Sequence, residues 1–316
     1  MQLVTPDTEL TLSCKNQRAV VSPWGASLRR YLLIDDGGRE MDLVWGYSGG
    51  SRKRGGQGDV LIPFPGRVAD GHYSFDGQSF QLECNDKEGP NAIHGFVRTL
   101  PWQVREAFTN KVTCEVRLDA DTYRAHGYPF SLEIALSYEL DAQGLSCAFL
   151  VKNVGTRTAP VGVGFHPYFT VGSSLIDEAE ARIPCAGYLE FNERLAPTGS
   201  ITTVAGTPWD YRQFRAVGRQ RFNHCYVHLE RDAQEMATAS LRHVASGRVI
   251  DIVMDAAFSA LVVYTGDAIA DTPRAALAIE PMTCATDAFN HPEWGLKRLE
   301  PSETFSGRYA IRHRMP

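Results

Sequence analysis

The chain has 316 residues, of which 43% are hydrophobic and 22% are charged, and its formal net charge is −5. Such a composition is typical of a globular protein that can bury a core without the help of metal ions or disulfides. The negative charge argues against binding to nucleic acid or to anionic membrane surfaces. No apolar stretch approaches the roughly 18 uninterrupted residues that span a bilayer.

Neither a secretion signal nor a disulfide framework is visible. Residues 1–7 contain no basic region and no apolar region of the kind that forms a signal peptide. The seven cysteines are dispersed, odd in number and without a C-x-x-C pair. We therefore expect a cytoplasmic protein whose cysteines are reduced and mostly buried as small hydrophobic side chains.

Turns organise the first third of the chain. Residues 35–38, Asp-Asp-Gly-Gly, predict a hairpin turn rather than a phosphate-binding loop. The basic run of residues 52–54, Arg-Lys-Arg, precedes two glycines and predicts an exposed loop; the alternative is a rim that attracts an anionic substrate. Asp76-Gly77 lies between short apolar runs and predicts a second hairpin, because glycine accepts a positive φ.

Alternation of apolar and polar residues dominates the middle of the chain. Residues 111–118, 131–140 and 144–151 place apolar side chains at every second position. Successive side chains of a strand point to opposite faces, so these segments predict half-buried antiparallel strands, the last two joined by a turn at 141–144. Helical patterns are scarce and short, as at 175–183. With no internal repeat or linker, the sequence predicts an all-β chain, a large antiparallel β-sandwich forming a single domain over residues 1–316.

Four polar residues stand out because each lies in an apolar, strand-like surround. His166 precedes a proline, which restricts the local backbone, and its imidazole can donate or accept a proton near neutral pH. Glu280 lies in the apolar run 276–282, and burial would raise its pKa toward that of a general base. His94 follows a turn, and Arg67 supplies a counter-charge or a donor to hydroxyl groups. Together they are what a metal-free enzyme needs to move protons around a small polyol.

Other chemistries lack their usual patterns. There is no H-x-x-x-H, no H-E-x-x-H and no cluster of cysteines, so we expect no metal site. There is also no G-x-S-x-G elbow and no Walker-type loop, which leaves acyl transfer and nucleotide phosphoryl transfer unsupported. A glycosidase with two carboxylates stays conceivable, although only Glu280 has the right setting.

Taken in order, the motifs resemble those of the aldose 1-epimerase (galactose mutarotase) family, in wording closest to its bacterial branch. The resemblance spans most of the chain, and the order and spacing of the motifs make it specific although each motif alone is weak. The matching segments are 63–71 with the hairpin at 75–77, 91–95, 151–153 leading into 164–169, 197–199, 279–283 and 299–303.

The resemblance implies a galactose mutarotase-like supersandwich with an open cleft for a monosaccharide. In that family a glutamate takes the proton of the anomeric hydroxyl, a histidine protonates the ring oxygen, and the opened sugar recloses as the other anomer without a cofactor. Carried over by position, Glu280 would be the base and His166 the acid. His94 would form a hydrogen bond near the ring oxygen, and Arg67 would bind sugar hydroxyls.

The identity of the sugar stays open. Asn91 and Tyr168 lie within the matching motifs and, with Asn223, are expected to complete the substrate-binding set. Relatives of galactose mutarotase usually carry an aspartate where Asn223 stands. An ionised aspartate can only accept hydrogen bonds, whereas an amide both donates and accepts them, so the pattern of hydroxyl recognition differs.

Alternative functions remain. The basic loop at 52–54 favours a mutarotase specific for an anionic hexose, with a 6-phosphate or a 6-sulfonate. A catalytically silent carbohydrate-binding protein is a second alternative, although it has no need of a matched acid and base. A carbohydrate lyase or hydrolase would require a tyrosine or a second carboxylate, for which Tyr168 and Asp255 are the candidates. The sequence does not choose between a monomer and a homodimer.

Overall fold

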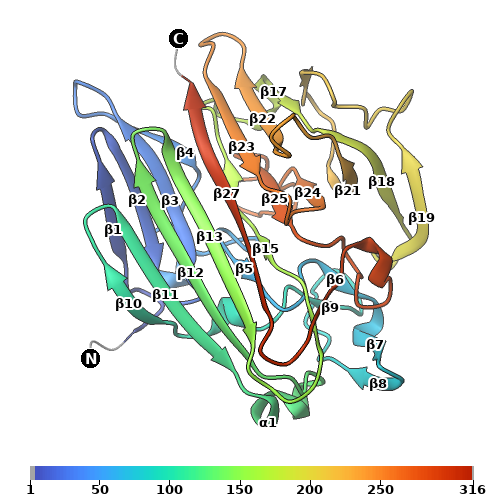
Figure 1. Cartoon of the computed structure of the whole chain (residues 1–316). Helices are drawn as coiled ribbons and strands as arrows, with labels where there is room; N and C mark the ends of the chain where they lie inside the picture. The colour runs from blue at the N-terminus through green and yellow to red at the C-terminus, as the bar shows by residue number, and fades with distance from the viewer. Residues whose placement is uncertain (1–3, 315–316) are drawn as a thin grey trace.

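Two large antiparallel sheets make up most of the computed structural model, which describes residues 4–314 (Figure 1). The segment 1–7, on which the prediction of no signal peptide depends, therefore lies partly outside the described residues. Among the described helices, none has both the length and the apolar character needed to cross a membrane.

The larger sheet contains twelve of the strands found within residues 4–314. In spatial order these are β1 (Leu10–Cys14), β2 (Gln17–Ser22), β3 (Ser27–Ile34), β4 (Glu40–Val44), β16 (Tyr168–Phe169), β25 (Leu277–Met282), β24 (Ala260–Tyr264), β21 (Asn223–Leu229), β18 (Cys185–Phe191) and β19 (Pro197–Thr203), with β15 (Gly164–Phe165) pairing with both β25 and β5 (Val60–Leu61). β25 thus lies in the interior of the sheet, and all six of its residues are buried.

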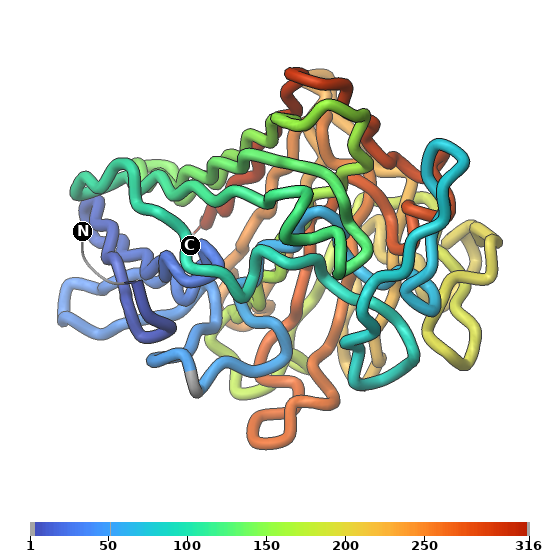
Figure 2. Tube along the Cα trace, turned by 90° about the horizontal axis from the view of Figure 1, so that it is seen from below, coloured from blue at the N-terminus to red at the C-terminus, as the bar shows by residue number. Residues whose placement is uncertain are grey.

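The smaller sheet has nine strands in the same part of the chain. Its spatial order is β10 (Gln103–Ala107), β11 (Lys111–Leu118), β12 (Leu132–Asp141), β13 (Gly144–Asn153), β27 (Thr304–Arg314), β23 (Val249–Met254), β22 (Ala237–His243), β17 (Ala179–Arg182) and β20 (Arg215–Ala216). The N-terminal strands, blue, lie beside the green strands of this sheet in both views (Figures 1 and 2), and β1 contacts β12.

Short ribbons and single turns complete the described chain. The two-stranded ribbons are β6 (Arg67–Val68) with β9 (Ala92–Ile93), β7 (His72–Phe75) with β8 (Gln78–Gln81), and β14 (Ala159–Val161) with β26 (Lys297–Leu299). The α-helix α1 (Ala120–Tyr123) has one turn, and the 3-10 turns are Gly50–Arg52, Ala69–Gly71, Val97–Thr99, Arg124–His126, Ile176–Glu178 and Pro292–Trp294.

The predicted β-sandwich is confirmed. It follows from side chains that alternate between apolar and polar along strands such as β12, which gives these strands one buried face. Along β12 the alternate side chains from Leu132 to Leu140 are buried, whereas Glu133 and Glu139 are exposed. The hairpin between β12 and β13 closes on the pair Asp141 and Gly144, as the turn chemistry predicted. The buried faces of both sheets contribute to one hydrophobic core.

The segment 175–183 departs from the predicted helix. It contains only the 3-10 turn Ile176–Glu178, and Ala179–Arg182 is the strand β17, which pairs with β22. Ala179, Ala181 and Ile183 are buried while the residues between them are half-exposed, which is the pattern of a strand. Backbone hydrogen bonds to β22 decide the structure of this segment, and the local sequence does not show that β22 lies beside it.

Five of the seven cysteines are buried and all seven are free, in line with the prediction that they are reduced small hydrophobes. Cys84 is exposed and Cys14 is half-buried, so these two do not follow the pattern.

Candidate active site

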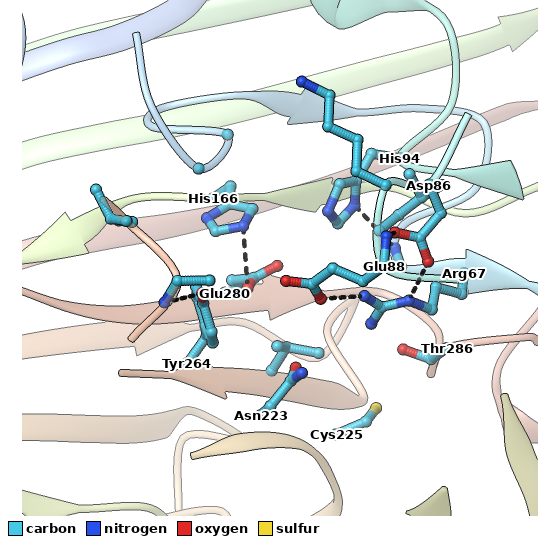
Figure 3. Close-up of a pocket in the computed structure, with 18 of the residues that line it drawn as sticks. Arg67, Asp86, Glu88, His94, His166, Asn223, Cys225, Tyr264, Glu280 and Thr286 are labelled. Carbon is cyan, nitrogen blue, oxygen red and sulfur yellow. Dashed lines mark hydrogen bonds and ion pairs between the residues drawn. The ribbon is translucent and has the colours of Figure 1, made fainter. Parts of the chain in front are cut away.

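A cavity of about 530 Å³ opens over the larger sheet and brings together five residues that the sequence predicted. These are Arg67, His94, His166, Asn223 and Glu280, which come from β6, the end of β9, the β15–β16 connection, β21 and β25 (Figure 3). The volume lies within the range of small-molecule sites, roughly 300–1,000 Å³.

Glu280 lies on the interior strand β25 and is only 2% exposed. Its Oε1 lies 3.3 Å from Nε2 of His166, and its Oε2 has no hydrogen-bond partner among the described residues. Burial raises the pKa of Glu280 well above its usual value; the charge of Arg67 opposes this rise and that of Asp59 adds to it. Burial therefore favours the neutral carboxyl over a wider pH range than in water, in agreement with the raised pKa that the sequence predicted.

His166 lies between β15 and β16 and is held by tight packing around it. A Cβ at Gly164 would lie 2.6 Å from Pro65, so the glycine allows the close backbone approach that the sequence suggested. The ring stacks on Tyr168 with centroids 5.1 Å apart, and Nδ1 is buried without a partner in the described chain. Burial lowers the pKa of His166 to about 3, below the neutral range in which the sequence analysis placed its proton exchange, so the imidazole is neutral at rest.

His94 faces His166 at a centroid distance of 5.4 Å, with the rings nearly perpendicular. It follows β9 with a φ of 68°, a left-handed conformation that is uncommon outside glycine. Its Nδ1 accepts a hydrogen bond of 3.3 Å from the backbone N–H of Gly66. Burial lowers its pKa well below the usual value, and the neighbouring His166, Arg98 and Arg67 lower it further.

Arg67 does not stand free in the cavity, because two acidic residues bind it. Its Nε lies 2.7 Å from Asp86 and its Nη2 lies 3.0 Å from Glu88, whose side chain reaches across the cavity in Figure 3. Although burial opposes the change, hydrogen bonds from Arg67, the backbone of Glu88 and Asn91 lower the pKa of Asp86. Neither acid was predicted from the sequence: the charged run 86–88, two residues before the matching segment 91–95, places acidic residues near that motif but does not show that they bind Arg67.

A buried ion cluster lies behind the imidazoles. Asp59 is 2% exposed and pairs with both Lys53 and Arg98, the latter at 3.3 Å. Burial raises the pKa of Asp59 and the two cations oppose the rise. The basic run at 52–54 is therefore divided: Lys53 serves this cluster, Arg52 lies outside the cavity, and Arg54 alone of the three lines it.

Other members of the lining were not predicted. Arg98, His224, Tyr264 and Thr286 line the cavity beside Asn223, and burial lowers the pKa of His224 to about 4. His224 follows Asn223 directly and could have been noticed there. The fold alone identifies Tyr264, because β24 pairs with β25 and brings Tyr264 and Ala278 opposite each other.

Three further candidates do not reach the cavity lining. Asn91 is 1% exposed and its amide donates to Asp86 and to the carbonyl of Arg194, so it orders the loop beside Arg67. Tyr168 is buried behind His166, with its hydroxyl donating to the carbonyl of Gly55 at 2.7 Å. Asp255 accepts hydrogen bonds from backbone N–H groups, including that of Ala257 at 3.0 Å, and is not part of the lining.

The fold also brings together three potential metal ligands that sequence spacing does not reveal. Ligand atoms of His94, His166 and Glu280 lie within 4.8 Å of one another. A metal-bound imidazole almost always donates its second N–H to an acceptor. Nδ1 of His94 instead accepts from Gly66, and Nδ1 of His166 has no partner in the described chain. The surroundings of the two Nδ1 atoms therefore do not fit a metal centre, whereas His94, His166 and Glu280 together suit hydrogen bonding and proton transfer.

Comparisons with known proteins agree with this geometry. Residues 8–312 match the family model described as aldose 1-epimerase. An uncharacterized protein of Escherichia coli (strain K12), YihR, is 32% identical over 234 residues, covering 74% of this chain and 71% of that protein. Galactose mutarotase of Sus scrofa is 29% identical, over 74% of this chain and 71% of its own. The crystal structure of a GalM/aldose epimerase homologue from C. elegans superposes with a TM-score of 0.86 at 18% identity, over 98% of this chain and 99% of that one, which shows a shared fold.

Proposed function

The chain belongs to the aldose 1-epimerase family and is an isomerase, and we propose that it interconverts the α and β anomers of a monosaccharide by acid–base catalysis. A base removes the proton of the anomeric hydroxyl, the bond between C1 and the ring oxygen breaks, and an acid protonates that oxygen. The open aldehyde rotates about C1–C2 and recloses from its other face, which returns each proton to its donor. No atom is gained or lost.

The contact between Glu280 and His166 carries this proposal. Both side chains are buried beneath the cavity, and their Oε1 and Nε2 atoms lie 3.3 Å apart. Burial disfavours both charged forms, because it raises the pKa of Glu280 and lowers that of His166 to about 3. Ring opening gives the proton of the anomeric hydroxyl to the base and takes one from the acid, and ring closure reverses both transfers, so two groups in contact can serve both directions. Glu280 is the proposed base and His166 the proposed acid.

The remaining cavity residues serve binding in this proposal. His94 donates to the ring oxygen, and Arg67 and Asn223 bind hydroxyls on the rest of the sugar. Since Asp86 and Glu88 already bind Arg67, the acids accept hydrogen bonds from hydroxyls while the guanidinium donates them. Asn91 and Tyr168 support the wall of the cavity instead of touching the sugar.

Polarimetry of freshly dissolved α-D-glucose and α-D-galactose tests the proposal directly. Both sugars mutarotate slowly without catalyst, so a protein that speeds the decay of optical rotation in proportion to its concentration is a mutarotase. Sugar binding without any acceleration would instead favour the carbohydrate-binding alternative.

A second candidate is a mutarotase of an anionic hexose, which the position of Arg54 in the cavity lining favours. Faster mutarotation of glucose 6-phosphate or 6-sulfoglucose in the presence of the protein, with no change in the rate for glucose and galactose, would select this candidate.

We also propose that residues 1–316 act as one unit. The family match runs from residue 8 to residue 312, and one hydrophobic core extends from Leu12 on the first strand to Ile311 on the last.

A further inference from the structure

We propose that the backbone N–H of Gly66 fixes His94 as the tautomer protonated on Nε2, which makes His94 a permanent hydrogen-bond donor and leaves His166 as the imidazole that exchanges a proton. The mechanistic part rests on the proposed function, whereas the tautomer itself can be observed without turnover. Gly66 then acts as a positioning residue through its main chain.

The argument starts from the direction of one hydrogen bond. A backbone N–H can only donate, so the Nδ1 atom of His94, 3.3 Å from the nitrogen of Gly66, must accept. A neutral imidazole with a lone pair on Nδ1 carries its proton on Nε2. Protonation of Nδ1 would place two N–H groups head to head.

Backbone geometry makes the contact reciprocal. The N–H of His94 donates to the carbonyl of Gly66 at 3.0 Å, so the two residues are joined by two hydrogen bonds. Both have a left-handed backbone, with φ of 71° at Gly66 and 68° at His94. A Cβ at Gly66 would lie 2.5 Å from Oγ1 of Thr286, so glycine is needed both for the conformation and for the space. A strained histidine held in this way indicates a constraint on its ring.

The charges around His94 act in the same direction. The groups that shift its pKa are His166, Arg98 and Arg67, none of which carries negative charge. Burial and these neighbours lower the pKa of His94, so they favour the neutral ring that the Gly66 contact orients. Glu280 also faces His94, with a carboxyl oxygen within 4.8 Å of a ring nitrogen of His94. Among the described residues, the close contact of Glu280 is with Nε2 of His166, at 3.3 Å, and not with His94.

His166 differs at the corresponding atom. Its Nδ1 has no fixed donor or acceptor among the described residues, and its Nε2 faces a carboxyl oxygen that can both give and take a proton. The imidazoles of His94 and His166, with ring centroids 5.4 Å apart, therefore have different duties: the first orients the sugar and the second moves the proton.

Nitrogen-15 NMR of the histidine rings tests the tautomer in the unmodified protein. His94→Gln identifies its signals by their loss. We expect Nδ1 of His94 to stay unprotonated and Nε2 to stay protonated throughout the pH range in which the fold persists. A proton on Nδ1 at neutral pH would overturn the proposal, whatever the enzymatic activity.

Kinetics of His94→Gln and His94→Leu test the function. A glutamine amide can offer an N–H close to the position of Nε2 but cannot exchange a proton as an imidazole does. We expect His94→Gln to keep kcat/KM within about tenfold of the wild type, whereas His94→Leu loses about 10²–10³-fold as one donor is removed. His166→Gln and His166→Leu should both lose about 10²–10⁴-fold.

Equal losses in the two His94 variants, with folding verified by circular dichroism, would refute the donor role even if NMR supports the tautomer. If the wild type accelerates no sugar, the proposed function fails, and the NMR result still decides the tautomer.

Discussion

Replacing Glu280 by glutamine removes a proton acceptor and changes the shape of the site very little. The amide has the size of the carboxyl group, and its oxygen can still accept a hydrogen bond from Nε2 of His166, 3.3 Å away. Loss of a positioned base lowers kcat by about 10²–10⁴-fold, or about 2.7–5.4 kcal/mol at 1.36 kcal/mol per tenfold. We expect this loss in kcat while KM changes little, because the sugar hydroxyls keep their partners.

The same substitution should make the fold more stable at neutral and alkaline pH. Burial raises the pKa of Glu280 above its ordinary value of 4.5. The carboxyl group therefore contributes its full stability below that pH, and the contribution is lost as the pH rises through the folded-state pKa. Glutamine has no such loss. The free energy of unfolding of the variant, measured with urea, should exceed that of the wild type increasingly as the pH rises from about 5 to about 8.

Polarimetry with the preferred sugar measures the rate, and Glu139→Gln is the matched control. Glu139 is exposed on β12, in the other sheet, and its replacement should leave both rate and stability unchanged. A folded Glu280→Gln protein that mutarotates the sugar at the wild-type rate would show that Glu280 is not the base. A variant whose relative stability falls as the pH rises would refute the burial argument.

Three further predictions concern the surroundings of the pair. Asp59→Asn leaves Lys53 and Arg98 without their buried carboxylate, and we expect a loss of about 3–5 kcal/mol in unfolding free energy by urea titration; unchanged stability would contradict the structural role of the cluster. Arg54→Ala should raise KM about tenfold or more for a hexose 6-phosphate and spare glucose, with Arg52→Ala as the control outside the cavity. Equal effects on both sugars would remove Arg54 from substrate selection. Asn223→Asp should change the ratio of KM for glucose and galactose more than it changes kcat, and a constant ratio would mean that Asn223 touches no discriminating hydroxyl.

The alternation of apolar and polar residues and the turn residues were sufficient to predict an antiparallel β-sandwich and several of its strands. The alternation at 111–118 reappears as β11, and Asp76-Gly77 joins β7 to β8 with positive φ at both residues. These features are local, so a single sequence contains them. The strand β17 was missed because its pairing with β22 joins segments some sixty residues apart, and its short alternation resembles one helical turn.

The candidate site was predictable where polar residues interrupt apolar runs. His166 and Glu280 were found for this reason, and the fold places them in contact. Contacts between site residues and other parts of the chain were not predictable in this way. Nothing in the sequence places Asp86 beside Arg67, or the N–H of Gly66 beside His94. Such contacts depend on main-chain direction and loop course, which a residue pattern does not encode.

The location of Glu280 on an interior strand has a consequence for how the protein loses its activity. Strands paired on both edges open with the largest free energies, whereas loops such as those that carry Glu88 and Arg54 open with the smallest. On warming, the loop residues that we propose to bind the sugar should therefore loosen before the proposed acid and base. We expect the protein to lose selectivity among sugars at a lower temperature than it loses activity. For the same reason, loop substitutions can redirect it to new sugars in evolution while β25 stays unchanged.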